Sequence, residues 1–371
     1  MDRRTYLRTS GSFIASGLLL GGCAVANKEH PTSATGKVIV SPNRVIGEMA
    51  GLRPYRKKGF RIEMETDGDK TIIHNYGHGG CGITLCWGSA LKAVEFIKAL
   101  NPTEQEIGVI GCGVIGLTTA REIQRLGFKV AIFADKLPPY TTSNLAGALW
   151  EPTTIGDPDI FDDAYPSRLA EVARMSYKRF TKMLGPKYGV RFIDRYRVGN
   201  TADEFQRYKS RWEADLTPEL YPGKETLNVE NNPFKTNMGE RQKAIHIDPD
   251  IFLNQLIRDF RIAGGNIYTH NFSSRSEIFE VGRNIMFNCA GMGAAKLFDD
   301  TSLVPVKGQL LSLLPQDNVD YILFGPGGYL MRRSNSIILG GSHDEGIWNL
   351  SVDPQVSSRI MTQHKQFFDS Y

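Results

Sequence analysis

Residues 106–116 read Glu-Ile-Gly-Val-Ile-Gly-Cys-Gly-Val-Ile-Gly, and this stretch decides the fold. Its apolar beginning is typical of a short buried parallel strand. A second apolar run occupies 129–134, and Gly127 before it can end a helix. Between the two runs, residues suited to one buried helix face recur at helical spacing: Ile115, Thr119, Ile123 and Leu126. The stretch therefore predicts a strand–helix–strand unit of a parallel sheet.

The glycines of this unit have the spacing G-x-G-x-x-G where the strand passes into the helix. Gly111 allows the tight turn, Gly113 lets a pyrophosphate approach the backbone, and Gly116 lets the helix pack closely on the strand. The helix N-terminus adds free N–H groups and the positive end of its dipole. Asp135 follows the second strand, where an acidic side chain accepts hydrogen bonds from an adenosine ribose. We predict a dinucleotide-binding unit; an ordinary α/β unit with a tight turn is the alternative.

The composition is that of a globular chain long enough for two domains. The chain has 371 residues, of which 41% are apolar and 23% charged. A net charge of +4 is too balanced to indicate a nucleic-acid partner. Apart from Cys23, the cysteines lack the spacing of zinc or C-x-x-C sites. We expect small buried residues there, with neither a metal site nor a required disulfide: Cys81, Cys86, Cys112 and Cys289.

The first residues read as an export signal. Residues 2–8, Asp-Arg-Arg-Thr-Tyr-Leu-Arg, match a twin-arginine signal, and the apolar segment 12–20 is too short to remain in a membrane. Residues 20–23, Leu-Gly-Gly-Cys, fit a lipoprotein cleavage box with Cys23 as lipid anchor, whereas Ala-Val-Ala at 24–26 fits an ordinary cleavage site. The sequence leaves both cleavage sites open, and a cytosolic chain with a positively charged N-terminal segment is a third alternative. We expect an export signal over 1–26, a polar tether over 27–42, and a periplasmic or membrane-anchored protein.

Other elements follow from periodicity and capping residues. Residues 51–56 predict a turn, and 59–65 alternate apolar with charged residues as a half-buried strand does. Glycines between a strand and a helix predicted at 89–100 would let backbone approach a ligand. Asp248 and Asp353, each followed by a proline, predict two helix starts.

Six blocks of the sequence resemble the D-amino acid oxidase family, which includes D-aspartate oxidase. The blocks are 109–116, 133–150, 288–291, 328–351, 51–54 and 73–88. The resemblance implies an α/β fold with a Rossmann-type FAD-binding domain and an antiparallel-sheet α+β substrate domain. It assigns 70–155 and 241–300 to the FAD-binding domain, and 43–69, 156–240 and 301–371 to the substrate domain.

The order of the blocks differs from that of the family. The Arg-Pro block at 51–54 and the block Ile-His-Asn-Tyr-Gly-His-Gly-Gly at 73–80 lie at the C-terminal end in the family, but here they precede the glycine motif. The chain therefore resembles a circularly permuted member. Such a rearrangement is physically reasonable because domain termini often lie close together.

The resemblance implies non-covalent FAD and names the residues that hold it. The ADP half would contact Gly111, Gly113, Ile115, Gly116, Asp135, Lys136, Thr142 and Ser143. The flavin would be lined by Gly147, Leu149, Gly79, Gly80, Gly82, Ile83 and Thr84. A helix starting near Ser89 would direct its positive end at the flavin.

The family reaction is the oxidation of a D-amino acid. By resemblance, Arg53 would pair with the substrate carboxylate, and Tyr329 would add a hydroxyl. The substrate would lose a hydride to flavin N5 without a protein base, since His74 and His78 read as structural histidines. The imino acid would hydrolyse to a 2-oxo acid and ammonia, and dioxygen would reoxidise the flavin to give hydrogen peroxide.

Substrate choice, electron acceptor and oligomeric state stay open between alternatives. We expect neutral or apolar D-amino acids, because the stretch before Tyr329 contains no base and Tyr321 and Phe324 would form an apolar lid. Arg332 or Arg333 turning inward would instead favour D-aspartate. A glycine oxidase, a quinone-linked dehydrogenase and a binding protein without turnover are further alternatives. The sequence leaves the oligomeric state open, with a homodimer as one alternative.

Overall fold

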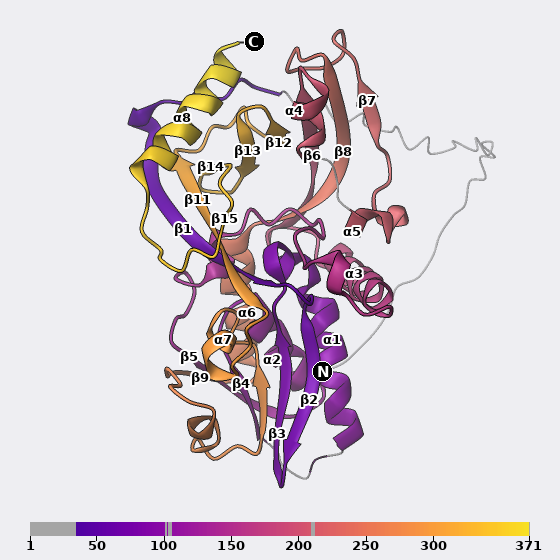
Figure 1. The fold of residues 1–371 in the computed structure, drawn as a ribbon, viewed down its shortest axis with the longest axis vertical. Helices are drawn as coiled ribbons and strands as arrows, with labels where there is room; N and C mark the ends of the chain where they lie inside the picture. Colours follow the sequence, from indigo (N-terminus) through magenta and orange to yellow (C-terminus); the bar gives the residue numbers. More distant parts are fainter. Residues whose placement is uncertain (1–34, 101, 103–105, 209–211, 371) are drawn as a thin grey trace, which may run out of the picture. The chain divides into compact units, whose positions relative to one another are not determined.

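The computed structural model describes residues 35–100, 102, 106–208 and 212–370. In this part of the chain the strands form two sheets (Figure 1). The six-stranded sheet has the order β2 (Arg61–Asp67), β3 (Lys70–Tyr76), β10 (Ile285–Asn288), β4 (Glu106–Ile110), β5 (Lys129–Ala134) and β9 (Asn266–Thr269). The nine-stranded sheet has the order β1 (Val45–Arg56), β11 (Leu303–Leu313), β14 (Ile337–Gly340), β13 (Gly328–Arg332), β12 (Tyr321–Gly325), β6 (Val190–Gly199), β8 (Met238–Ile247) and β7 (Glu225–Leu227), with β15 (Asp344–Glu345) paired to β11.

Helices cover both sheets. The longer ones are α1 (Gly82–Leu100), α2 (Val114–Arg125), α3 (Tyr165–Thr181), α6 (Pro249–Ile262) and α8 (Pro354–Asp369), and the short ones are α4 (Ala202–Gln206), α5 (Trp212–Asp215) and α7 (Gly293–Leu297). The predicted caps are confirmed, since the Asp248 carboxylate accepts from the first backbone N–H groups of α6 and Asp353 does the same for α8. No helix among the described residues is long and apolar enough to cross a membrane.

The predicted strand–helix–strand unit is confirmed as β4, α2 and β5. β4 pairs in parallel with β5 on one side and β10 on the other, and its residues are almost all buried. α2 ends where Gly127 adopts a φ of 94°. β3 extends the parallel sheet beyond β10, and β2 closes that edge as an antiparallel partner of β3.

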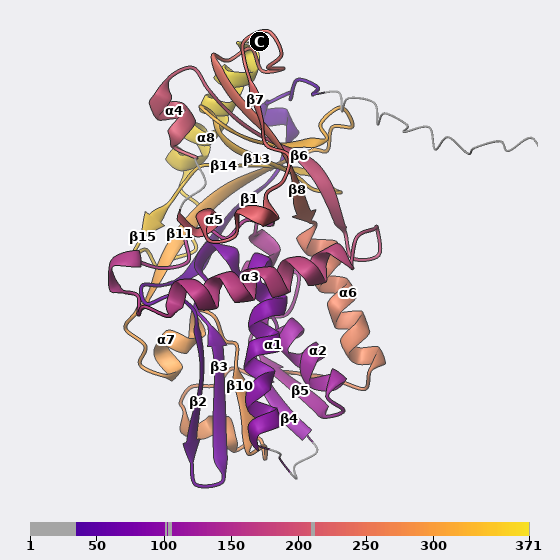
Figure 2. The same cartoon turned by 90° about the vertical axis from the view of Figure 1, so that its right-hand side faces the viewer.

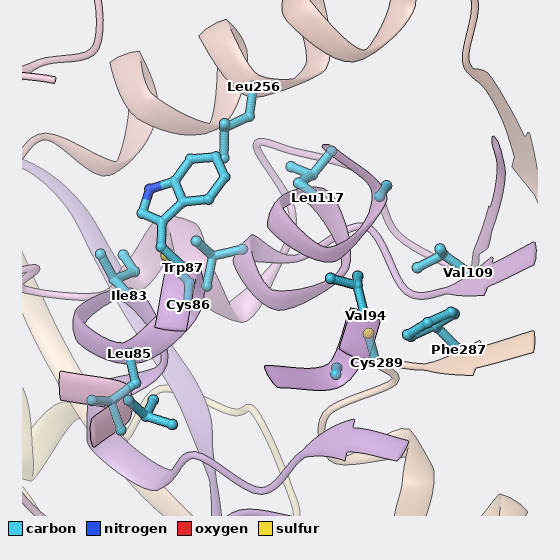
Figure 3. Packing of buried hydrophobic residues seen from close by; sticks show 14 of the residues in the cluster. Ile83, Leu85, Cys86, Trp87, Val94, Val109, Leu117, Leu256, Phe287 and Cys289 are labelled. Carbon is cyan, nitrogen blue, oxygen red and sulfur yellow. The ribbon is translucent and has the colours of Figure 1, made fainter. Parts of the chain in front are cut away.

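α1 begins seven residues before the predicted start at Ser89, so that start was wrong. Figure 2 shows α3 crossing α1, and the crossing lies at Gly88, where an added Cβ would stand 2.0 Å from the Val172 carbonyl oxygen. The Gly88 N–H donates to Ser176 Oγ at 2.8 Å. This close packing, with Trp87 buried against α6 in the same core (Figure 3), keeps a glycine-rich segment helical against its low propensity.

β1 is one continuous strand, so the turn predicted at 51–56 was wrong. It pairs antiparallel with β11 from Val45 to Arg56, and Gly51 stands opposite Gly308. β1 is the edge strand of its sheet, where a proline such as Pro54 removes no necessary ladder hydrogen bond. The Gly-x-Arg-Pro pattern of a turn is therefore accommodated in a strand.

The polar tether predicted over 27–42 is wrong from residue 35 onward. Val38 and Val40 are buried in a second core with α8 and the nine-stranded sheet, while Ile39 between them is exposed. The segment is also held by hydrogen bonds: Gly36 N–H donates to the Asn318 carbonyl at 3.0 Å. The alternation of Val38 and Val40 was the signal, and the polar residues around it concealed it. The rest of the predicted tether and the export signal lie outside the described residues.

Two of the predicted domain boundaries divide paired strands. β2 lies in the sheet of the strand–helix–strand unit, although 43–69 were assigned to the substrate domain. β8 lies in the nine-stranded sheet, although its residues from 241 were assigned to the FAD-binding domain. β2 belongs to its sheet because it pairs with β3, and β8 belongs to its sheet because it pairs with β6. The hydrophobic periodicity of one segment does not show which other segment it pairs with.

Candidate active site

A cavity of about 630 Å³ opens where the parallel strands of the six-stranded sheet end. Such a crevice at the carboxyl ends of parallel strands is the usual ligand site of this type of sheet. One end is lined by residues that follow β4, β5 and β10, among them Asp135 and Ser143. The other end is lined by residues of the nine-stranded sheet, among them Arg53 and Tyr329. The cavity therefore joins the two sheets.

Most of the residues predicted for the site line this one cavity. They are Arg53, Gly79, Gly80, Gly82, Ile83, Gly111, Gly113, Ile115, Asp135, Lys136, Thr142, Ser143, Gly147 and Tyr329. Three predicted residues do not line it. Thr84 Oγ1 donates to the Leu149 and Glu151 carbonyls instead, and Leu149 packs into the core of the nine-stranded sheet. Gly116 faces the strand, as its predicted packing role requires.

The glycine motif has the geometry expected for a phosphate-binding turn. Gly111 adopts a φ of 100°, and an added Cβ would stand 2.5 Å from the Cys289 carbonyl oxygen. At Gly116 an added Cβ would stand 2.0 Å from the Gly111 carbonyl oxygen. Gly113 caps α2 without a side chain, and the Val114 N–H donates to Ser143 Oγ at 3.0 Å. Ser143 thus accepts from one N–H at the start of α2, and this helix N-terminus, which lines the cavity, is suited to phosphate oxygens.

A second glycine-rich segment borders the cavity before α1. Gly79 has a φ of 55°, and an added Cβ would stand 2.0 Å from the Thr154 carbonyl oxygen. Gly82 is the first residue of α1 and lines the cavity. A helix N-terminus thus borders the cavity at Gly82, seven residues before the start that the sequence predicted near Ser89.

Arg53 supplies the charge at the end of the cavity formed by the nine-stranded sheet. Its Nη1 atom is buried and has no hydrogen-bond partner among the described residues. A buried guanidinium nitrogen left without a partner is costly, so a ligand with anionic oxygens fits here. Tyr329 lies on β13 and is half-buried.

Burial lowers the pKa of two histidines near the cavity, His74 and His78. Burial lowers the pKa of His78 to about 3, and this ring stacks on Phe60 at 5.4 Å between centroids. Burial, with Arg61 nearby, lowers the pKa of His74 to about 4, and its Nδ1 lies 3.1 Å from Asn288 Nδ2. Both histidines therefore support structure, as predicted, and neither is a useful base near pH 7.

Sequence reasoning missed the residues that follow β9. His270, Asn271, Phe272 and Ser273 line the cavity beside Asp135, and the His270 and Phe272 rings lie 4.4 Å apart. The missing signal was the strand itself: β9 has only four residues and is mostly exposed, so its periodicity is weak. Its parallel pairing to β5 brings these residues to the site.

The residues present fit a flavin dinucleotide. Asn75 Oδ1 and His78 Nε2 are buried in the cavity region without hydrogen-bond partners among the described residues, so polar ligand groups can be satisfied there. Lys136 and Lys296 line the cavity in addition to Arg53, whereas Asp135 is its one carboxylate among the described lining residues. This positive balance suits the two charges of a pyrophosphate.

The fold and this site define a class, the dinucleotide-dependent oxidoreductases with a second, substrate-binding sheet. A family model described as FAD dependent oxidoreductase matches residues 106–370. The chain belongs to this family, and FAD is its cofactor.

Curated relatives agree with this membership. A D-amino-acid oxidase of Rubrobacter xylanophilus is 29% identical over 262 residues, which cover 68% of this chain and 74% of the relative. A D-amino-acid oxidase of Dictyostelium discoideum is 26% identical over 261 residues, with 68% and 70% covered. The human D-aspartate oxidase is 25% identical over 269 residues, with 69% and 74% covered.

Solved structures show the same fold. A glycine oxidase from Bacillus cereus superposes with a TM-score of 0.52 at 17% identity, covering 70% of this chain and 77% of the other. An L-α-glycerophosphate oxidase from Mycoplasma pneumoniae, solved with FAD bound, superposes with a TM-score of 0.53 at 14% identity, covering 72% and 79%.

We expect Asp135→Ala to weaken FAD binding about 10- to 100-fold, because it removes hydrogen bonds from ribose hydroxyls to a charged acceptor. Flavin fluorescence during titration of the apoprotein measures the dissociation constant. Asp69→Ala, at an exposed turn between β2 and β3, is the matched control and should leave it unchanged. Equal FAD affinity in the two variants would refute the ribose role of Asp135.

Proposed function

We propose that this protein oxidises D-amino acids to 2-oxo acids and ammonia, with dioxygen accepting the electrons as hydrogen peroxide. The D-amino-acid oxidases among its relatives support the substrate class. The observation that carries the proposal is the Arg53 guanidinium, whose Nη1 is buried in the cavity without a partner among the described residues. An α-carboxylate satisfies that group.

The chain's own residues bind and orient the substrate. Arg53 holds the carboxylate, and the Tyr329 hydroxyl adds a second contact at the same end of the cavity. Bound FAD supplies the hydride acceptor. Burial lowers the pKa of His74 and His78 and makes both weak bases, which fits loss of the substrate's α-hydrogen as hydride.

Substitution of Arg53 tests the proposal. We expect Arg53→Ala to lower kcat/KM for D-amino acids about 30- to 4000-fold, the cost of about 2–5 kcal/mol for losing one partner of a buried charge pair. FAD content should be unchanged. Arg258→Ala, at an exposed position of α6, is the control and should keep full activity. An Arg53→Ala enzyme with wild-type kcat/KM would remove the basis of the proposal.

The same enzyme distinguishes the alternatives for the acceptor. A D-amino acid added without oxygen should bleach the flavin absorbance, and air should restore it. Bleaching that persists in air until a quinone is added means a dehydrogenase. Flavin that no D-amino acid bleaches means a binding protein without turnover.

We propose further that neutral or apolar side chains are preferred. Arg332 points toward Asp320, with 3.9 Å between Nε and the carboxylate, and neither lines the cavity. Arg333 donates to the carbonyls of Asn144 and Ala146. Neither arginine therefore offers a second cation to an acidic substrate.

Phe324 does not line the cavity itself but packs beside Tyr329, with 6.3 Å between ring centroids, and Tyr208 packs against Phe324 at 5.6 Å. The lid role expected of Tyr321 is wrong: this side chain is fully buried in the core with α8, and its hydroxyl donates to the Gly36 carbonyl. One cation does lie behind Phe324, since Arg195 covers its ring at 5.1 Å, but Arg195 is matched by Glu151 and Glu240.

Steady-state kinetics with D-alanine, D-phenylalanine, D-aspartate and glycine test the preference. We expect kcat/KM to be higher for D-alanine and D-phenylalanine than for D-aspartate, because an unpaired side-chain carboxylate is costly to bury. Arg332→Ala should have the same effect on kcat/KM for every one of these substrates. The highest kcat/KM with D-aspartate or with glycine would contradict this proposal.

The order of the blocks supports a circular permutation, which we propose for this chain. The family model matches from residue 106 onward, yet β2, β3 and α1 before it complete the same sheet and site. A permutation would have opened the chain between α8 and the segment before β1, so these two segments should lie close together. They do, since Val38 and Val40 share a core with Phe367 and Phe368 of α8. The pKa of Asp369 is lowered by Lys365 and, more weakly, by Lys37.

Reordering the chain tests the permutation. A protein that starts at residue 106, joins residue 370 to residue 35 by a flexible linker and ends at residue 100 should fold and bind FAD. The control is a chain reopened inside α2, which should not fold. A soluble control together with an insoluble reordered chain would contradict the permutation.

We also propose export by the twin-arginine route, supported by the motif at residues 2–8 and the fact that this route carries folded proteins with their cofactors. Cell fractionation of the full chain and of an Arg3→Lys/Arg4→Lys variant measures it: retention of only the variant in the cytoplasm is expected. Mass spectrometry of the mature N-terminus distinguishes a lipid at Cys23 from cleavage after Ala26.

Whether the enzyme is a monomer or a homodimer follows from its molar mass in solution.

A further inference from the structure

Both residues proposed to bind the substrate lie flat on a glycine of a neighbouring strand. A Cβ added to Gly308 would stand 2.6 Å from Arg53 Nη1, 2.7 Å from Nη2 and 2.9 Å from Cζ. A Cβ added to Gly340 would stand 2.1 Å from Cζ of Tyr329 and 2.4 Å from its hydroxyl oxygen. In each case the atoms concerned are the tip of the side chain, the part that would meet a substrate.

The strand order makes these two side chains converge. Arg53 is on β1 and Tyr329 on β13, with β11 and β14 between them, as Figure 1 shows. Three inter-strand spacings, about 14 Å, therefore separate the two backbones. Arg53 leans inward over β11 and Tyr329 leans inward over β14, so their tips approach from opposite sides.

The register places the two glycines and the two side chains on one face. Gly308 is paired with Gly51, which lies two residues before Arg53 on β1 and therefore on the same face. Gly340 is paired directly with Tyr329. Leu310 pairs with Gly340 and lines the cavity, which identifies this face as the cavity side. Gly308 and Gly340 thus form a floor without side chains beneath the tips of Arg53 and Tyr329.

Glycine in a buried strand has a cost, because it loses backbone entropy and offers no side chain to pack. Neither Gly308 nor Gly340 adopts a positive φ, so backbone conformation does not require glycine at either position. Both are buried in the middle of the sheet. These positions differ in what lies above them: the Arg53 guanidinium and the Tyr329 ring occupy the space that a Cβ would fill.

We propose that Gly308 and Gly340 are positioning residues for substrate binding. They let the Arg53 guanidinium and the Tyr329 ring lie against the sheet, which keeps the space above them free for the substrate carboxylate and aims both groups at it. An alanine at Gly308 lifts the guanidinium into that space, and an alanine at Gly340 displaces the tyrosine ring. This inference rests on the proposed function, because it assumes that Arg53 binds the substrate.

Gly308→Ala tests the first half. The clash is with the end of a flexible side chain, so the protein should fold, and its thermal midpoint and FAD affinity should match those of Gly47→Ala. That control lies on the same strand pair, where an added Cβ stands 3.9 Å from Ser312 Cβ. KM for D-alanine should rise about tenfold to a hundredfold in Gly308→Ala, with a smaller change in kcat, as expected for a binding group displaced by about an ångström. A lowered thermal midpoint or FAD affinity with unchanged KM would mean a structural role and overturn the proposal.

Gly340→Ala needs a double-mutant cycle, because a displaced aromatic ring also affects packing. In the Tyr329→Ala background, Gly340→Ala should change neither KM nor the thermal midpoint, because the ring that it would displace is absent. An undiminished effect in that background would show that Gly340 acts through another group and overturn this half.

The two proposals fail differently. If Arg53→Ala keeps wild-type kcat/KM, the proposed substrate contact is wrong, whatever the glycine variants do. If Arg53→Ala loses activity while Gly308→Ala retains the KM of Gly47→Ala, only the positioning role is refuted.

Discussion

The close contact between α2 and the turn at Gly111 is the constraint on which the rest of the site depends. Gly116 stands so near the Gly111 carbonyl that no side chain fits between them. This contact fixes the direction of α2, whose first N–H groups then face the cavity. Asp135 reaches the same cavity because β5 is hydrogen-bonded to β4 in register. The cofactor end of the site is thus a consequence of packing one helix onto one strand.

The sequence was most informative where local rules are strong. Glycine spacing and Asp-Pro helix starts were predicted correctly because each depends on residues within one segment, as the unit from Glu106 to Asp135 and the start of α6 show. The strand predicted at 59–65 is present two residues later, as β2. The wrong predictions concern segments whose state is decided by distant partners. α1 starts early because α3 packs on Gly88, and 51–56 is extended because β11 pairs with it. Residues 35–40 are likewise ordered by a core built from the C-terminal helix.

The site residues also divide into those that the sequence could indicate and those that depend on distant strands. Arg53 and Tyr329 could be named by resemblance, and they line one cavity although 276 positions separate them. Gly308 and Gly340 could not be found in this way, because a glycine in a strand pattern gives no sign of what lies over it. Only the register of four adjacent strands reveals that each supports a side chain rooted on another strand. The residues after β9 escaped prediction for a related reason, since a four-residue exposed strand carries little periodicity.

The electrostatics of the cavity concentrate positive charge at one point of the substrate end. His78 borders that end and would be a second cation there if it were protonated, but burial keeps it neutral across the physiological range. Among the described lining residues contributed by β1, β11 and β13, Arg53 is the one formal charge. Under the proposed function, a zwitterionic substrate would be oriented by its carboxylate, because these described lining residues include no carboxylate to compete for its ammonium group. Because Gly308 has no side chain, the Arg53 guanidinium lies close against the sheet, and the same arginine that is proposed to attract the substrate would leave room for it.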